Sequence, residues 1–334
     1  MTRQDFLKKA GLGLAAVGIY GNAPGQPGTV EKYKKMITQE NSYEIVVVGG
    51  SYSGLSAAMA LGRSLRKTLI IDSGLPCNRQ TPHSHNFITH DGRKPADIAH
   101  DAKQQVLAYP TVKAISDRVV EVTGEDHNFT IQSATGNSYN AKKLLFATGV
   151  KDIMPAIDGF AACWGITILH CPYCHGYEVR GKNTGILVND ESAMEFAKLI
   201  RHWTDQVTVF TNGEAKFNKD ELKGLGVLIE EKAIANIKQA NGFISAIQFT
   251  DGSTISLDAL YHRPAFEQHC EIPVTMGCEM TETGHIKVNE SQQTTLPGIY
   301  ASGDCATRMR AVSVSVVQGS VAGAMLNHEL ISGS

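Results

Sequence analysis

The sequence predicts an α/β fold of two Rossmann-like, three-layer domains, the second inserted into the first. A buried strand, a glycine-rich turn and a helix follow one another over residues 44–65. A second strand–helix–strand pattern, with a different turn, occupies residues 185–210. Two further apolar strands, 144–146 and 298–300, lie on either side of that second pattern. Because strands alternating with helices indicate parallel sheets, we expect the first domain to be interrupted by the second.

Length and composition exclude several classes of protein. At 334 residues the chain is long enough for two domains of about 150 residues each. Lys and Arg number 31 against 33 for Asp and Glu, without the basic excess of a nucleic-acid binder. Hydrophobic residues make up 42%, well above a disordered chain. No apolar run reaches the ~18–20 residues of a membrane span. We expect neither a nucleic-acid partner nor a membrane span.

Residues 1–42 are expected to form a leader and linker before the folded part. The basic start and the apolar stretch from Ala10 to Tyr20 resemble a twin-arginine export signal in which Gln4 replaces the second arginine. The alternative is a leader without export function. The sequence therefore leaves both the cytoplasm, our first expectation, and periplasmic export open.

The first strand leads into a dinucleotide-type turn. The segment EIVVV is followed by GGSYSG at 49–54, a helix over 55–65 and a strand that ends at Asp72. In such a unit the turn brings backbone amides close to a pyrophosphate, and the acid binds ribose hydroxyls. Ser51 replaces the middle glycine of the usual G-x-G-x-x-G.

Two later strands also end in small residues. Residues 144–146 lead into Ala147-Thr148-Gly149, and residues 298–300 lead into Ala301-Ser302-Gly303-Asp304. A helix is expected near 314–326. Taken singly, each of these is only a strand that ends in small residues.

Two of the seven cysteines form a C-x-x-C pair, Cys171 and Cys174, within HCPYCHGYE. Two thiols at this spacing readily form a disulfide, so electron pairs can move by thiol–disulfide exchange. The imidazole of His175 can accept and return a thiol proton near neutral pH. We take Cys171, Cys174 and His175 as candidate catalytic residues. The other cysteines are expected to be small core residues: Cys77, Cys163, Cys270, Cys278 and Cys305.

The same motif has other interpretations. C-x-x-C-H is also the attachment pattern of c-type haem, and zinc could bind both cysteines with His170 or His175. The dinucleotide-type motifs have no place in a cytochrome, and no second C-x-x-C or H-x₃-H supplies further zinc ligands. We therefore expect no metal. A buried structural pair of thiols is the remaining alternative.

With these motifs in this order, residues 43–330 resemble the low-molecular-weight thioredoxin reductase family of flavoproteins. The matching segments are GGSYSG, ATG, a Pro155…Gly159 turn, CPYCHGYE and LPGIYASGD. The resemblance implies FAD as cofactor, a homodimer, Cys174 beside the flavin and Cys171 in exchange with the substrate. We expect an FAD domain of residues 43–153 and 267–334, and an inserted domain of residues 154–266 that carries the C-x-x-C.

The resemblance also implies which residues hold FAD. The strand ends close the site, the late Asp binds the ribityl and pyrophosphate region, and the following helix directs amides at the flavin. The loop NRQTPHSHN replaces the family's Gly-Gly-Gln loop, and its polar side chains could reach FAD. The candidate cofactor-binding residues are Gly49, Ser51, Tyr52, Ser53, Gly54, Asp72, Asn78, Arg79, His83, Asn86, Thr148, Gly149, Gly303, Asp304 and Val314.

The inserted domain lacks the features that bind NADPH in relatives that use it. Those relatives carry a second glycine turn and a His-Arg-Arg-type motif for the 2′-phosphate. Here the turn at 188–193 (VNDESA) has no glycine, and the strand end Thr211-Asn212-Gly213 has no arginine. Side chains in the turn block a pyrophosphate, and Asp190 and Glu191 repel it. We therefore expect no use of NADPH; a variant site that binds NADH by other contacts is the alternative.

His175 stands where ordinary thioredoxin reductases carry an acidic residue, which moves the resemblance toward thioredoxin reductase-like dithiol oxidases. We predict an FAD-dependent thiol–disulfide oxidoreductase that oxidises a small dithiol with O₂ or another acceptor. Because the exchange is reversible, the alternative is a reductase of a thioredoxin-like protein, supplied by ferredoxin, reduced flavin or a nicotinamide. A flavin redox sensor is the non-enzyme alternative.

Overall fold

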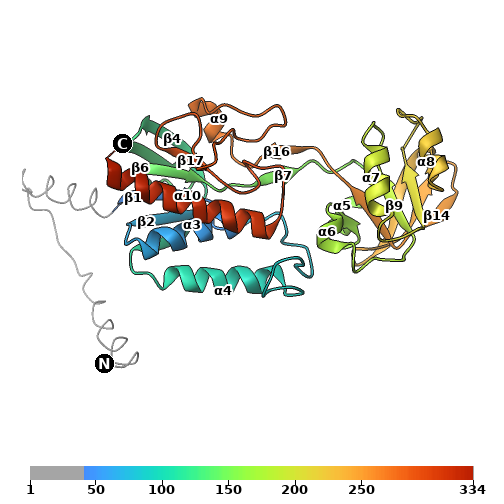
Figure 1. The fold of residues 1–334 in the computed structure, drawn as a ribbon, viewed down its shortest axis with the longest axis horizontal. Helices are drawn as coiled ribbons and strands as arrows, with labels where there is room; N and C mark the ends of the chain where they lie inside the picture. Colours follow the sequence, from blue (N-terminus) through green and yellow to red (C-terminus); the bar gives the residue numbers. More distant parts are fainter. Residues whose placement is uncertain (1–40, 334) are drawn as a thin grey trace, which may run out of the picture. The chain divides into compact units, whose positions relative to one another are not determined.

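The computed structural model of the protein describes residues 41–333. The predicted export signal lies outside the described residues. Figure 1 shows the helices and strands of the described part along the chain. They form an α/β fold with two mainly parallel sheets, so the predicted fold class is confirmed.

The first sheet has the strand order β3-β2-β1-β6-β5-β4. β17 pairs with the C-terminal end of β6, beyond the residues of β6 that pair with β5. β1 is parallel to both of its neighbours, and Ile45, Val46 and Val47 are buried on both faces of the sheet. Continuous burial of this kind is typical of a central parallel strand. The strands are β1 Ser42–Val48, β2 Thr68–Asp72, β3 Val112–Ser116, β4 Val119–Glu125, β5 Asn128–Ser133, β6 Ser138–Phe146 and β17 Ile299–Ala301.

Three helices cover one face of the first sheet: α3 Tyr52–Arg63, α4 Pro95–Leu107 and α10 Val312–Ser332. α3 and α10 lie side by side (Figure 1) and touch backbone to backbone. A Cβ atom on Gly319 would lie 2.1 Å from the carbonyl oxygen of Ser53, and one on Gly323 would lie 2.6 Å from that of Ala57. Any larger residue would force the helices apart.

The second sheet is entirely parallel, with the order β11-β10-β9-β15-β8. One face packs against a three-stranded antiparallel sheet, and α7 and α8 cover the other. A turn at Asp251-Gly252 joins the antiparallel strands β13 and β14. The elements are α5 Phe160–Cys163, β8 Ile168–Leu169, α6 Pro172–His175, β9 Thr184–Leu187, α7 Ala193–Ile200, β10 Val207–Phe210, α8 Asp220–Gly224, β11 Leu228–Glu230, β12 Ile234–Ala240, β13 Phe243–Phe249, β14 Thr254–Ser256 and β15 Ala259–His262.

The chain passes between the sheets twice, in β7 Val150–Asp152 and β16 Phe266–Gln268, which pair antiparallel. The short helix α9, Ile272–Met276, follows the return strand. Across residues 41–333, none of the helices combines the length and apolar character of a membrane span.

Helix ends differ most from the expectations. The helix predicted over 55–65 begins at Tyr52, because the glycine turn itself already supplies the first helical bond, from the amide of Leu55 to the carbonyl of Ser51. The helix expected near 314–326 extends from Val312 to Ser332. The helix of the strand–helix–strand pattern over 185–210 is α7, which has eight residues.

A fully buried lysine attaches the last turns of α10 to the first sheet. The ammonium of Lys143 in β6 donates to the carboxylates of Asp126, at 2.8 Å, and Glu329, at 2.6 Å. Glu329 also accepts a hydrogen bond from the hydroxyl of Tyr300. Burial alone would raise the pKa of Glu329, but the bonds from Lys143 and Tyr300 bring that pKa below its ordinary value.

We expect Lys143→Met to lower the free energy of unfolding by about 3 kcal/mol, because two carboxylates lose their shared cation. The difference should shrink in acid, as the pH falls through the lowered pKa of Glu329. The control is Lys151→Met, which removes the exposed pair with Glu267 and should cost less than about 1 kcal/mol. Urea unfolding measures both; equal losses in the two variants would contradict the assignment.

Candidate active site

One pocket is lined by residues from both the first sheet and the C-x-x-C segment. Its walls are the turn after β1, the loop from Leu75 to Asn86, the strand ends after β6 and β17, and the start of α10. It brings most of the predicted site residues together: Ser51, Tyr52, Ser53, Asn78, His83, Asn86, Thr148, Gly149, Cys171, Cys174, His175, Gly303 and Asp304. Gly49, Gly54, Asp72, Arg79 and Val314 do not line it.

Three of the residues outside the lining shape the turn. A Cβ atom on Gly54 would lie 1.9 Å from the carbonyl oxygen of Gly49, so the turn closes only with glycine at position 54. The amide of Gly50 donates to Asp72 Oδ1 at 3.0 Å, which fixes the acid at the end of β2.

The other two residues outside the lining, Arg79 and Val314, lie away from the turn. Arg79 is exposed and donates to the carbonyl of Pro76 in its own loop, at 3.2 Å. Val314 lies in the first turn of α10, just behind the lining residues Ala311 and Val312.

Two long helices begin at the pocket without a side-chain cap. α3 starts after Ser51 and α10 starts after Ala311, and neither residue caps its helix through a side chain. Uncapped first-turn amides and the helix dipole favour an anionic ligand. The hydroxyls of Ser53 and Ser302 lie 2.6 Å apart and join α3 to the segment after β17.

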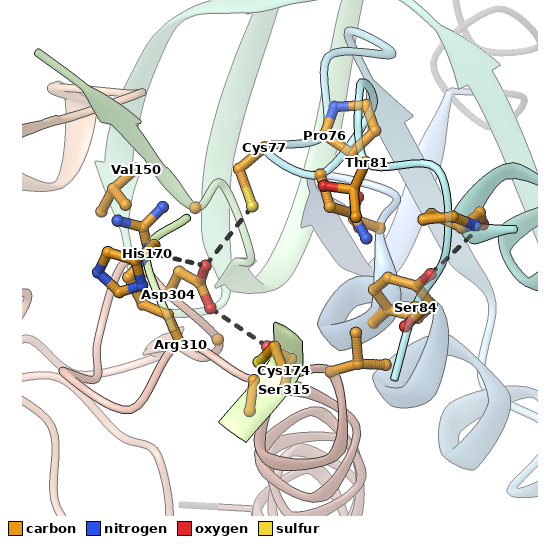
Figure 2. Close-up of a pocket in the computed structure, with 18 of the residues that line it drawn as sticks. Pro76, Cys77, Thr81, Ser84, Val150, His170, Cys174, Asp304, Arg310 and Ser315 are labelled. Atoms are coloured by element: carbon orange, nitrogen blue, oxygen red, sulfur yellow. Dashed lines mark hydrogen bonds and ion pairs between the residues drawn. The ribbon is translucent and has the colours of Figure 1, made fainter. Parts of the chain in front are cut away.

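The structure adds Arg310, which the sequence analysis did not single out. Its guanidinium donates to both carboxylate oxygens of Asp152, at 2.6 and 3.1 Å, and Nε donates to Asp304 at 3.4 Å. Burial raises the pKa of Asp304, and the charge of Arg310 opposes that rise. Figure 2 shows Arg310, Cys77 and Ser315 arranged around Asp304. No local pattern signals this set, since Asp152 lies far from Arg310 in sequence.

The redox pair lies at the start of α6. The two sulfur atoms are 3.0 Å apart, both thiols are free, and the thiol of Cys174 donates to the sulfur of Cys171. This bond lowers the pKa of Cys171, with help from the amides of Cys174 and Tyr173 and against the effect of burial. The same bond raises the pKa of Cys174. Of the two thiols, that of Cys171 therefore loses its proton more readily.

Two histidines flank the pair and line the pocket. Burial lowers the pKa of His175 to about 4, with the charge of Glu178 opposing that fall. Burial and the charge of Arg310 lower the pKa of His170 to about 4 as well. Burial therefore favours the neutral form of both imidazoles at neutral pH and makes them weaker bases than a free imidazole.

The prediction that Cys77 is a core residue is wrong. Cys77 lies in an irregular loop, is exposed and lines the pocket, with its sulfur 3.7 Å from a carboxylate oxygen of Asp304. Although its surface opens to the pocket, the surrounding protein and Asp304 raise its pKa to about 11. The other four cysteines expected in the core are Cys163, Cys278 and Cys305, which are buried, and Cys270, which is partly buried.

Within residues 41–333, no group of three or more His, Cys, Asp or Glu side chains is arranged to hold a metal ion. The two sheets, the glycine turn and the dithiol in a shared pocket define a flavin-dependent disulfide oxidoreductase.

Comparison with known proteins gives the family. Residues 43–319 match pyridine nucleotide-disulphide oxidoreductases, and the chain belongs to this family as a thioredoxin reductase-like flavoprotein. Thioredoxin reductase sirT of Leptosphaeria maculans is 32% identical, over 89% of this chain and 97% of its own. Thioredoxin reductase tcpT of Claviceps purpurea is 30% identical, with the same coverage. The crystal structure of an oxidoreductase from Agrobacterium tumefaciens has a TM-score of 0.82 at 32% identity and covers 88% of this chain and 100% of that one.

The predicted family, enzyme class and FAD cofactor are thereby confirmed. The pocket fits FAD in its chemistry. Two uncapped helix N-termini suit a pyrophosphate, and the glycine turn would let the backbone approach it. Asp72, outside the lining, is held at the end of β2, where it would bind a ribose hydroxyl.

We expect iodoacetamide to modify Cys171 rather than Cys174 or Cys77 in the reduced protein at pH 7, as mapped by mass spectrometry. Cys174→Ala removes the thiol that donates to Cys171. The pKa of Cys171 should then rise, and its alkylation at pH 7 should slow by about tenfold. Cys278→Ala, in the core, is the control. Faster alkylation of Cys171 in Cys174→Ala would show that the sulfur–sulfur bond does not stabilise the thiolate.

Proposed function

We propose that this protein is an FAD-dependent dithiol oxidase that uses Cys171 and Cys174 and does not need a nicotinamide. The observation that carries the proposal is in the second sheet. There, at the ends of β9 and β10, where a nucleotide would bind in a protein of this architecture, the chain's own side chains make hydrogen bonds that a nucleotide would have to replace.

Asn189 lies just after the end of β9. Its Nδ2 atom donates to the carbonyls of Thr211 and Glu214, both at 3.0 Å, and its Oδ1 atom accepts from the amide of Lys216 at 2.8 Å. All three of these hydrogen bonds join Asn189 to the loop that follows β10. A pyrophosphate could enter only by breaking these bonds.

Asp190 takes a position that a phosphate would need. Its Oδ1 atom accepts a hydrogen bond of 2.8 Å from the amide of Ser192, directly before α7. In nucleotide sites the amides at the start of such a helix bind phosphate oxygens. Here the carboxylate of Asp190 binds the amide directly before this helix start, and its charge would repel a phosphate placed there.

The chemistry at the cysteines follows from the pair's geometry. A substrate thiolate attacks the Cys171 sulfur of the oxidised pair, the disulfide breaks, and Cys174 leaves as a thiolate. The second substrate thiolate attacks the sulfur of the substrate in this mixed disulfide, so the substrate becomes a disulfide and Cys171 is released. His175 and His170 are placed to accept the thiol protons. FAD, when bound, accepts the two electrons, which then pass to O₂ or another acceptor.

The domain division predicted from the sequence is part of this proposal. Residues 43–153 and 267–334 would bind FAD, and residues 154–266 would carry the redox pair. The pairing of β7 with β16 supports it, because both crossings of the chain fall at these limits. The site residues inferred from the resemblance, and the homodimer, are likewise proposals.

A second candidate function is reduction of a thioredoxin-like protein. The relatives named above carry the name thioredoxin reductase. Tyr173 and Tyr177, beside the redox pair, are 64% and 66% exposed. Exposed aromatic side chains of this kind suit contact with a protein partner. We prefer the small dithiol because the bonds of Asn189 and Asp190 oppose the binding of a nicotinamide, the usual source of reducing electrons.

Anaerobic stopped-flow spectroscopy tests the proposal. Dithiothreitol should reduce the bound flavin, whereas NADPH and NADH should not bleach it at a useful rate, because hydride transfer needs a nicotinamide held against the flavin. Cys171→Ser should abolish reduction by dithiothreitol while FAD stays bound. Rapid bleaching by micromolar NADPH would contradict the proposal.

A further inference from the structure

The helix that carries the redox pair is very short. α6 has four residues, Pro172–His175, with Cys171 before it and Gly176 after it. The amide of Cys174 donates to the carbonyl of Cys171 at 3.3 Å, and the amide of Gly176 donates to that of Pro172 at 2.7 Å. Isolated helices shorter than about 12–15 residues are marginal in water. The turn that brings the two sulfur atoms together therefore depends on packing from outside.

The indole of Trp203 supplies such packing. The ring of Tyr173 meets it edge to face, with ring centroids 5.8 Å apart and planes at 88°. A Cβ atom on Gly176 would lie 2.9 Å from both Cε2 and Nε1 of the indole, so the backbone of the turn lies directly against the ring. Tyr173 and Gly176 are three residues apart, a spacing that places both on the same side of a helical turn.

The glycine at position 176 is explained by this approach. Its φ of −64° and ψ of −31° are those of an ordinary right-handed helix, which does not call for glycine. What excludes a side chain is the space taken by the indole and by the carbonyl oxygen of Pro172, which a Cβ atom would approach to 2.5 Å. The redox turn and Trp203 are therefore fitted to each other.

The backbone of Trp203 is held by bonds that do not involve its ring. Trp203 follows α7, which packs against the second sheet. Its amide donates to the carbonyl of Ile200 at 2.9 Å, and its carbonyl accepts from the amide of Gly181 at 2.8 Å. The hydroxyl of the next residue, Thr204, donates to the carbonyl of Lys182 at 2.8 Å. Removal of the indole leaves these bonds in place.

We propose that Trp203 is a positioning residue for the redox pair, whose indole holds α6 in the turn that keeps the thiol of Cys174 against the sulfur of Cys171. The two sulfur atoms are 3.0 Å apart, and their bond makes Cys171 the more readily ionised thiol. Trp203 acts on the sulfur atoms through α6. The inference concerns the dithiol itself, so it holds for either direction of electron flow and for any electron acceptor.

The test follows alkylation of Cys171 by iodoacetamide against pH, in the FAD-loaded protein kept reduced under anaerobic conditions. The rate at pH 7 divided by the plateau rate in alkali gives the thiolate fraction, and this ratio cancels any change in access to the sulfur. In Trp203→Ala the fraction should fall by about threefold, because a looser α6 weakens the bond between the sulfur atoms and raises the pKa of Cys171.

Two milder variants keep the test decisive if Trp203→Ala does not fold. Tyr173→Ala removes an exposed ring that contacts the indole, and it should lower the thiolate fraction in the same direction by a smaller factor. Trp203→Phe keeps a ring at this position, and its thiolate fraction should lie between those of Trp203→Ala and wild type.

A double variant separates positioning from a direct effect on Cys171. Cys174→Ala removes the thiol that donates to Cys171, so adding Trp203→Ala to it should cause no further change. The matched control is Tyr109→Ala. The side chain of Tyr109 also packs against a helix glycine, since a Cβ atom on Gly62 would lie 2.8 Å from it, but it does not line the pocket. This control should leave the thiolate fraction unchanged.

The outcomes are distinct. A lowered fraction in the single variants that disappears in the Cys174→Ala background supports the inference. An unchanged fraction in Tyr173→Ala and in the folded Trp203 variants overturns it. A further fall in the double variant, or an equal fall in Tyr109→Ala, also overturns it, because the effect would then not pass through the sulfur–sulfur bond. None of these readings uses flavin reduction, so this inference and the proposed function can fail separately.

Discussion

The buried guanidinium of Arg310 holds three segments of the pocket in one arrangement. It binds Asp152 through two hydrogen bonds, where the chain leaves the first sheet, and Asp304, where the chain returns to it. Buried charges are tolerated only when all partners are present. The strand β7, the loop after β17 and the start of α10 therefore cannot shift independently, and the uncapped amides of α10 take their position from this ion pair.

Both sheets place helix starts near strand ends, and all three of the helices α3, α7 and α10 begin without a side-chain cap. In the first sheet, the starts of α3 and α10 have no side-chain cap and open into the pocket. In the second, Asp190 accepts a hydrogen bond from the amide of Ser192 directly before α7, and Asn189 donates to the loop after β10. Under the proposed function, a fold of this kind keeps one cofactor site and loses the other by changes in a single turn.

Patterns within a few residues predicted most of the architecture. The glycine turn, the apolar strands and the C-x-x-C pair depend on neighbours in sequence, and they gave the fold class, the family and the cofactor. The Arg310–Asp152 and His85–Glu178 contacts join residues far apart in the chain, and their side chains look like ordinary surface charges in the sequence. Cys77 was misplaced because the burial of an irregular loop residue depends on the cavity around it.

The bonds of Asn189 also bear on how such a domain changes over evolutionary time. Replacing Asn189 with a small residue would reopen the crevice but leave the carbonyls of Thr211 and Glu214 and the amide of Lys216 without this partner. Each loss carries a cost in stability before any nucleotide contact exists to offset it. Under the proposed function, a change of this domain toward a nucleotide-binding crevice would therefore pass through a less stable intermediate.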